Sequence, residues 1–223
     1  MPAMNILLTG FEPFGDPLHG PAVNPSWEVA RALHGEALGG ATVHARRLPT
    51  RFAGAPQALA DALAALRPGL VIALGQASGR SEVSIERVAV NLIDARIPDN
   101  DGVRPLDQPV RPGAPAAYFS TLPVKALRDG LRAAGHPAGL SLSAGAFVCN
   151  QVFFELQHRL AGRGVPSGFI HLPALPEQAA ATQPCVPSMG LAAQVDAVRL
   201  AVRIALSGGE APAGRPDDGA PVS

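Results

Sequence analysis

Charge of one sign is what this sequence lacks most clearly. Its 18 lysine and arginine residues balance 18 aspartate and glutamate residues, so the formal net charge at pH 7 is zero. A partner rich in phosphate, such as a nucleic acid or an anionic membrane surface, would need a basic face. No apolar run approaches the roughly 18 residues that cross a bilayer, and the N-terminus carries no signal-peptide pattern. The sequence therefore predicts neither a nucleic-acid partner nor a membrane partner.

Cysteine and aromatic residues are also scarce. The two cysteines, Cys149 and Cys185, give no disulfide framework in a chain of 223 residues, and we expect a reducing cytoplasm. With only eight Phe, one Trp and one Tyr in the chain, the pair Phe11 and Phe14 needs an explanation. These rings could cap the core, or they could wall a small apolar pocket at the carboxyl end of a strand. Composition favours neither interpretation over the other.

Apolar runs alternate with amphipathic segments along the first third of the chain. Strands are predicted over 4–9, 42–45 and 70–74, and helices over 24–33 and 57–66. This order is typical of a mostly parallel sheet with helices on both sides. Apolar residues make up 47% of the chain, enough to bury a sizeable core.

The rest of the chain continues this pattern. Residues 83–90 give an imperfect strand-like pattern, 102–116 are proline-rich and irregular, and a strand is predicted at 169–171. Helical spacing predicts helices over 122–133, 148–160 and 191–206. We therefore predict an α/β fold: a single catalytic domain over residues 1–207, with a disordered tail over 208–223.

Cys149 lies at the first turn of the helix predicted over 148–160. Unpaired backbone N–H groups and the positive end of the macrodipole favour a thiolate there. His171 ends the strand predicted at 169–171, so an imidazole could be held against the thiol. A cysteine and a histidine placed in this way are the minimum for a thiol nucleophile with its general base. From this pair alone, however, a buried cysteine that only packs is the more common case.

Glu86 interrupts an apolar context between Ile85 and Val88. A carboxylate there either forms an ion pair with a neighbour such as Arg87 or orients another group. The ion pair is the more common case. The preceding glycines, Gly75 and Gly79, do not have the spacing of a phosphate-binding loop, and the histidines show no metal-ligand spacing. The sequence therefore predicts neither a nucleotide nor a metal cofactor.

Six stretches together resemble one family. In chain order they are TGFEPFG, RLPTRF, GRSEVSIERVAVNLIDARIPDN, AYFSTLP, SAGAFVCN and SGFIHLPALPEQ, and they span most of residues 4–190. This ordered set resembles the pyroglutamyl peptidase I (pyrrolidone-carboxylate peptidase) family of cysteine peptidases. The resemblance implies a single three-layer α/β/α domain that removes an N-terminal L-pyroglutamyl residue from peptides. It also implies a thioester acyl-enzyme, no cofactor, and a homo-oligomer such as a tetramer.

The resemblance also assigns roles to individual residues. It places the nucleophile on Cys149 in SAGAFVCN, the base on His171 in FIHLP and the orienting carboxylate on Glu86 in SIERVAVN. Arg96 in DARIPDN takes the position that the family uses near the oxyanion. Further residues match the family's contacts with the lactam ring, as aromatic walls or as polar groups: Phe11, Phe14, Asn24, Thr50 and Gln76.

The chemistry of the substrate agrees with these assignments. A pyroglutamyl ring is small, flat and uncharged, so it suits an apolar slot with a few polar contacts. Proline lacks the ring carbonyl and would leave polar groups in the slot unpaired. The chain departs from the family pattern in a longer segment at 16–23 and in Phe147, where a tyrosine is common.

Two alternatives remain at the level of sequence. One is another enzyme on a similar scaffold, such as a nucleoside phosphorylase or a cysteine amidase, since a fold does not fix a function. The other is a binding module that keeps the pocket without turnover. An activated Cys149 should react with an alkylating agent well below the pH at which an ordinary thiol does, and a module without turnover need not.

Overall fold

The central sheet of the computed structural model has seven strands, and residues 4–14 and 23–209 are described. The strands are β1 (Met4–Phe11), β2 (Ala37–Leu38), β3 (Ala41–Leu48), β4 (Leu70–Gln76), β5 (Val83–Glu86), β8 (Ala138–Ser141) and β9 (Ser167–Leu172). Their order across the sheet is β2-β3-β1-β4-β9-β5-β8. Neighbouring strands are parallel except at β2–β3 and β5–β9, which confirms the prediction of a mostly parallel sheet.

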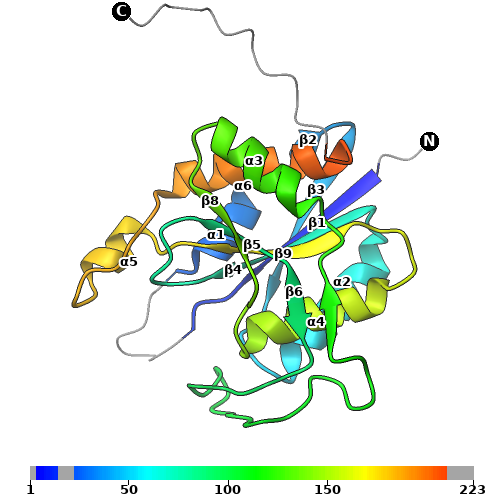
Figure 1. Cartoon of the computed structure of the whole chain (residues 1–223), viewed down its shortest axis with the longest axis vertical. Coiled ribbons are helices and arrows are strands. Elements are labelled where there is room, and N and C mark those ends of the chain that lie inside the picture. The colour runs from blue at the N-terminus through cyan, green and yellow to red at the C-terminus, as the bar shows by residue number, and fades with distance from the viewer. Residues whose placement is uncertain (1–3, 15–22, 210–223) are drawn as a thin grey trace, which may run out of the picture.

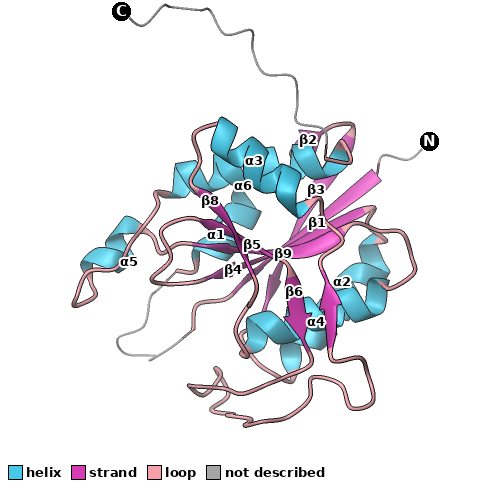
Figure 2. Cartoon of the chain, viewed as in Figure 1, coloured by secondary structure: helices cyan, strands magenta, loops and turns pink. Residues whose placement is uncertain are grey.

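Helices cover both faces of this sheet, as Figures 1 and 2 show. One face is covered by α1 (Pro25–Ala32), α3 (Val124–Ala133) and α6 (Leu191–Leu206). The other is covered by α2 (Gly54–Leu66) and α4 (Val148–Leu160), while α5 (Pro176–Ala180) is a short helix after β9. The three-layer α/β/α architecture implied by the family resemblance is confirmed.

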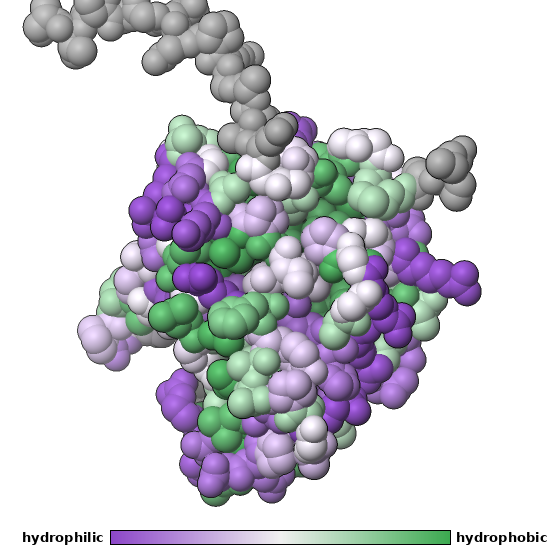
Figure 3. Space-filling model, turned by 45° about the vertical axis from the view of Figure 1, so that its right-hand side comes forward, coloured by the Kyte–Doolittle hydropathy of each residue, from purple (hydrophilic) through white to green (hydrophobic). Residues whose placement is uncertain are grey.

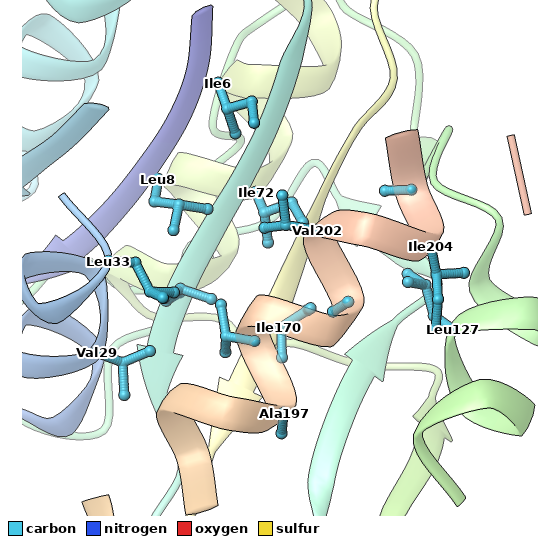
Figure 4. Packing of buried hydrophobic residues seen from close by; sticks show 14 of the residues in the cluster. Ile6, Leu8, Val29, Leu33, Ile72, Leu127, Ile170, Ala197, Val202 and Ile204 are labelled. Atoms are coloured by element: carbon cyan, nitrogen blue, oxygen red, sulfur yellow. The ribbon is translucent and has the colours of Figure 1, made fainter. Parts of the chain in front are cut away.

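Alternation along the strands divides the core between the two faces. Ile6 and Leu8 of β1 pack with the α1, α3 and α6 layer, whereas Leu7 between them packs with α2 and α4. Figure 4 shows the first of these clusters, in which Ile72 of β4 meets Val202 of α6. Because both faces are buried there, the central strand β4 has a continuous apolar run over residues 70–74. Each fully buried side chain of this size contributes about 1.5–3 kcal/mol.

The segment predicted as one strand-like pattern over 83–90 is divided between two sheets. β5 ends at Glu86, and β6 (Val88–Val90) pairs with β7 (Ala117–Phe119) in a separate two-stranded sheet. The division occurs at Arg87, whose N–H donates to Ser141 O at 2.8 Å while its carbonyl accepts from Ser120 N at 2.9 Å. One residue thus joins the edge of the main sheet to the small one.

Two expectations fall at least partly on residues that are not described. They are the longer segment at 16–23, of which only residue 23 is described, and the tail over 208–223, of which 208 and 209 are described. Within residues 4–14 and 23–209, no helix has the length and apolar character needed to cross a bilayer. Figure 3 shows hydrophilic and hydrophobic residues interspersed over the face in view.

Candidate active site

A buried imidazole–carboxylate pair lies within the main sheet. β9 carries His171, and the neighbouring antiparallel strand β5 ends at Glu86. The distance from His171 Nδ1 to Glu86 Oε1 is 2.8 Å, and the two residues are 4% and 0% exposed. Because an ionised carboxylate only accepts hydrogen bonds, Nδ1 carries the hydrogen and Nε2 keeps a free lone pair. The imidazole is therefore held in one tautomer and one orientation.

Arg80 is the second partner of this carboxylate. Its Nη1 lies 2.7 Å from Glu86 Oε1, and its Nη2 donates to Ser143 O at 3.1 Å. Burial by itself would raise the pKa of the Glu86 carboxyl group, but the interaction with His171, a hydrogen bond from Ser141 and the charge of Arg80 together outweigh it and lower that pKa. Glu86 thus does both things that were predicted as alternatives: it forms an ion pair and it orients a group.

The predicted ion-pair partner was wrong, because the arginine that pairs with Glu86 is Arg80 and not Arg87. Arg80 is the residue of the site that was not predicted from the sequence. It is the only basic residue between β4 and β5, which was the one available signal. Local sequence gives no means of telling which of two nearby arginines the folded loop turns toward a buried carboxylate.

Cys149 lies in the first turn of α4, as predicted, and is half-buried. The expected shift toward a thiolate is wrong. Surrounding protein atoms and the negative charge of Glu86 raise the pKa of the Cys149 thiol to about 12, against smaller lowering effects of the backbone and of Arg80. Burial also lowers the pKa of His171, although Glu86 opposes that shift. At neutral pH the thiol and the imidazole are therefore both uncharged.

The start of α4 is fixed to the small sheet by the residue after Cys149. Asn150 is fully buried, and its Oδ1 accepts from Val90 N at 3.0 Å. Its Nδ2 donates to Val90 O and to Leu92 O, each at 2.9 Å. These contacts hold the turn that carries the thiol in place. The charges of Glu86 and Arg80 both act on that thiol, so the three groups share one electrostatic environment.

Gly75 makes room for the histidine. It lies opposite His171 in the β4–β9 pairing. A Cβ at this position would come within 2.8 Å of Phe169 Cζ and 3.0 Å of His171 Cδ2. The rings of Phe169 and His171 are themselves in contact, with centroids 4.8 Å apart. The absence of a side chain at Gly75 thus allows the imidazole to pack against the sheet.

The two phenylalanines of the GFEPFG stretch have different surroundings. Phe11 is only 2% exposed and packs 6.4 Å from Phe169 between ring centroids, so it belongs to the core. Phe14 is half-buried and lies 6.4 Å from Phe147, the residue that precedes α4. Phe147 in turn meets Phe52 edge-on at 5.1 Å. Phe14 therefore belongs to an aromatic group beside the turn that carries the thiol.

The predicted polar contact residues have hydrogen-bond partners within the protein. Asn24 and Thr50 both donate to the backbone carbonyl of Glu12, at 3.1 and 3.0 Å. Asn24 also caps α1, since its Oδ1 accepts from Ser26 N at 3.1 Å. Their visible role is to hold the loop that follows β1, and contact with a substrate stays a prediction.

Gln76 and Arg96, the remaining predicted residues, differ in exposure. Gln76 is 9% exposed at the end of β4, and its Nε2 lies 3.1 Å from Oε1 of Gln178 in α5. Arg96 is exposed, and among the described residues it has no hydrogen-bond or ion-pair partner. Their roles toward a substrate also stay predictions.

Comparison with known proteins places this geometry in a family. The sequence model of a protein family described as "Pyroglutamyl peptidase" matches residues 4–208. The pyrrolidone-carboxylate peptidase of Cupriavidus taiwanensis is 54% identical over 205 residues, covering 91% of this chain and 93% of that protein. That of Chromobacterium violaceum is 54% identical over 205 residues, covering 92% and 94%. The chain belongs to the pyroglutamyl peptidase family.

Solved pyroglutamyl peptidases have the same fold. The crystal structure of pyroglutamyl peptidase I from Bacillus amyloliquefaciens matches with a TM-score of 0.87 at 39% identity, covering 92% of this chain and 98% of that one. A mutant pyrrolidone carboxyl peptidase from the hyperthermophile Pyrococcus furiosus matches with a TM-score of 0.88 at 43% identity, covering 92% and 99%. The agreement extends over nearly the whole described chain.

Membership of the pyroglutamyl peptidase family confirms that the chain is an enzyme, a hydrolase of the cysteine peptidase class. This family removes N-terminal pyroglutamate, which decides against a nucleoside phosphorylase and against a module without turnover. Both cysteines are free. Among the described residues, no cluster of three or more side chains could hold a metal ion.

Proposed function

We propose that Cys149, His171 and Glu86 form a catalytic triad that hydrolyses the amide bond after an N-terminal L-pyroglutamyl residue. The observation that carries this proposal is the buried hydrogen bond of 2.8 Å between His171 Nδ1 and Glu86 Oε1. It leaves Nε2 free as a base beside the helix that presents the only cysteine of the site. A nucleophile, a base and a group that orients the base are what amide hydrolysis by a thiol requires.

Acylation begins from an uncharged thiol and an uncharged imidazole. As Cys149 Sγ attacks the scissile carbonyl carbon, its proton passes to His171 Nε2, and the carbonyl oxygen becomes an oxyanion. The tetrahedral intermediate then collapses, the C–N bond breaks, and His171 returns the proton to the leaving amine. The product is a pyroglutamyl thioester on Cys149. Glu86 stabilises the imidazolium that exists between these two transfers.

Deacylation follows the same order of proton transfers, with water as the nucleophile. His171 Nε2 takes a proton from the water molecule as its oxygen attacks the thioester carbonyl carbon, and the proton then returns to sulfur as the C–S bond breaks. Pyroglutamate leaves and the thiol is restored. Backbone N–H groups in the first turn of α4, together with the exposed guanidinium of Arg96, are the proposed donors to the oxyanion in both halves.

The proposed lactam site lies between the loop after β1 and the start of α4. Phe14 and Phe147 supply half-buried apolar surface next to Cys149, and Phe11 supports it from the core. Gln76, Asn24 and Thr50 are the proposed polar groups around the ring. The hydrogen bonds that Asn24 and Thr50 make to Glu12 O support an indirect contribution through the shape of this loop.

We further propose that residues 1–207 act as one catalytic domain, in the cytoplasm and as a homo-oligomer. The continuous seven-stranded sheet supports a single unit, and two free cysteines suit a reducing compartment. The partners are peptides that begin with pyroglutamate. A separation by size together with light scattering would measure the oligomeric state directly.

A matched pair of substrates tests the proposed function. A pyroglutamyl-coumarin amide and the corresponding prolyl amide would be incubated with the full chain under reducing conditions. We expect rapid release of the coumarin from the pyroglutamyl amide and a rate about 10⁴-fold or more lower from the prolyl amide, because unpaired polar groups would penalise the ring without a carbonyl. Failure to cleave the pyroglutamyl amide, or equal cleavage of both, would overturn the proposal.

A further inference from the structure

Arg80 is the charged residue of the site to which the proposed mechanism gives no role. Its Nη1 lies 2.7 Å from Glu86 Oε1, the same oxygen that His171 Nδ1 approaches at 2.8 Å. Its Nη2 donates to Ser143 O at 3.1 Å, in the loop that leads to α4. One guanidinium therefore joins the β4–β5 loop, the end of β5 and the segment before the nucleophile.

The Glu86 carboxylate needs such a partner. It is 0% exposed, and among the described residues its Oε2 has no partner of ordinary hydrogen-bond geometry. The Ser141 hydroxyl also interacts with this carboxylate but carries no charge. An ionised carboxylate without water is costly unless it is paired, and it otherwise tends to take up a proton. Since the imidazole of His171 is uncharged at rest, its hydrogen bond alone supplies no positive charge. The guanidinium of Arg80, 2.7 Å from Oε1, supplies that charge.

We propose that Arg80 is a positioning residue for the reaction proposed above, on which this inference rests. It keeps Glu86 ionised and fixes the carboxylate so that Oε1 accepts from His171 Nδ1. His171 then stays in the tautomer whose Nε2 is free to take the proton from Cys149. Arg80 acts through Glu86 and His171 and does not itself touch the reacting atoms.

The charge of Arg80 acts in one direction on all three groups. It contributes to lowering the pKa values of Glu86, of His171 and of the Cys149 thiol. Among the described residues, the charges that act on His171 come from Glu86 on β5 and from Arg80 itself. On the neighbouring strand, β4 contributes the uncharged Gly75, and α4, which packs against β9, carries Cys149 in its first turn. Loss of Arg80 should therefore raise the pKa values of Glu86 and His171, so that a higher pH is needed to keep the Glu86 carboxylate ionised and the His171 imidazole neutral.

The test compares Arg80→Met with Arg87→Met, a matched control. Arg87 adjoins Glu86 in sequence, but its side chain has no hydrogen-bond or ion-pair partner among the described residues. The pH dependence of kcat/KM on the pyroglutamyl amide would be measured for both. In the pH profile of kcat/KM, we expect the acid limb to lie about one pH unit higher for Arg80→Met than for wild type, with a loss mainly in kcat. For Arg87→Met we expect the acid limb to stay where it is in wild type. Arg80→Lys keeps the positive charge, so its acid limb should lie close to the wild-type position.

A purely structural role of Arg80 would lower activity equally at all pH values and leave the acid limb in place, which would overturn the inference. A second readout needs no turnover: the imidazole signal of His171, assigned by its loss in His171→Gln, is titrated by NMR in wild type and in Arg80→Met. We expect a higher pKa of His171 in the variant, and an unchanged value would also overturn the inference. If wild type does not cleave the pyroglutamyl amide, the proposed function fails, while this titration still decides the role of Arg80.

Discussion

The reactivity of Cys149 depends on its tertiary surroundings more than on its place in a helix. The first turn of α4 offers backbone N–H groups, and these do lower the pKa of the thiol. Burial and the charge of Glu86 have the larger effect, so that the pKa rises to about 12. The thiol is therefore uncharged near neutral pH, and in the proposed mechanism it loses its proton only as it attacks the substrate.

This state of the thiol predicts slow alkylation. Cys185→Ser removes the other cysteine and leaves Cys149 as the single thiol of the chain. At pH 8, iodoacetamide should modify this thiol at least about tenfold more slowly than free N-acetylcysteine, because an ordinary thiol has a pKa near 8.5. Mass spectrometry over time measures the rate. A rapid reaction with a plateau below pH 8 would show a preformed thiolate and contradict the prediction.

Gly75→Ala tests the packing of the histidine. The added methyl group would meet Phe169 and His171 at 2.8 and 3.0 Å, so one of the two rings must move. If His171 acts as proposed, kcat/KM should fall at least about tenfold, since small displacements of a catalytic group are costly, and the free energy of unfolding should fall by about 1–3 kcal/mol.

The matched control for that substitution is Gly190→Ala. A Cβ at this residue, which precedes α6, meets no atom within 4 Å, and no positive φ is involved. Steady-state kinetics and thermal unfolding of both variants separate the two effects. Unchanged kinetics in Gly75→Ala would contradict the prediction, because they would show that the added methyl group is accommodated without moving the imidazole of His171.

Three loops meet at Glu12 at the carboxyl ends of β1 and β3. Its Oε1 accepts from Thr50 N at 3.0 Å and from Asn100 Nδ2 at 2.9 Å, and lies 2.8 Å from Arg51 Nη1. Its backbone carbonyl accepts from Asn24 and Thr50, as described above. This side chain thus fixes the loop that carries Phe14 against the loops from β3 and from the segment after Pro98.

Glu12→Ala should accordingly weaken substrate binding more than chemistry. With its anchor lost, the loop that carries Phe14 becomes mobile, and we expect KM for the pyroglutamyl amide to rise about tenfold or more while kcat changes less. Glu12→Gln keeps a hydrogen-bond acceptor, so its KM should lie between those of wild type and Glu12→Ala. Glu28→Ala is the control, because Glu28 pairs only with Arg31 on its own helix, α1, among the described residues. A fall in kcat alone in Glu12→Ala would contradict this role.

Elements formed by continuous local patterns could be predicted from the sequence. The apolar runs at 4–9 and 70–74 are buried strands, and the helix predicted over 191–206 begins and ends at those residues. The division of 83–90 at Arg87 could not be predicted, because it depends on partners 33 and 54 positions further along the chain (120 − 87 and 141 − 87). The short helix α5 also depends on distant partners, because its Gln178 contacts Gln76 and donates to Val23 O.

The candidate site could be predicted in part. Glu86, Cys149 and His171 stand in motifs that resemble the family, and the structure brings the first and third within hydrogen-bond distance. Arg80 was missed, and the direction of the Cys149 shift was wrong, because both depend on which charges and how much protein surround a group once the chain is folded.

At the scale of the whole molecule, the fold brings distant segments to one place. His171 and Glu86 are 85 positions apart, yet their strands are neighbours in the sheet. Cys149 reaches the same environment on α4, which packs against β9. The remaining cysteine, Cys185, is exposed in the segment between α5 and α6. The chain thus contains one cysteine inside the proposed site and one outside it.

This pair of cysteines gives the most direct test of Cys149 as the nucleophile. Hydrolysis of the pyroglutamyl-coumarin amide would be measured for wild type, Cys149→Ser and Cys185→Ser under reducing conditions. We predict that Cys149→Ser lowers kcat by at least about a thousandfold, as removal of a nucleophile does, while Cys185→Ser stays within about twofold of wild type. Activity of Cys149→Ser within tenfold of wild type, with its fold intact, would contradict the thiol mechanism.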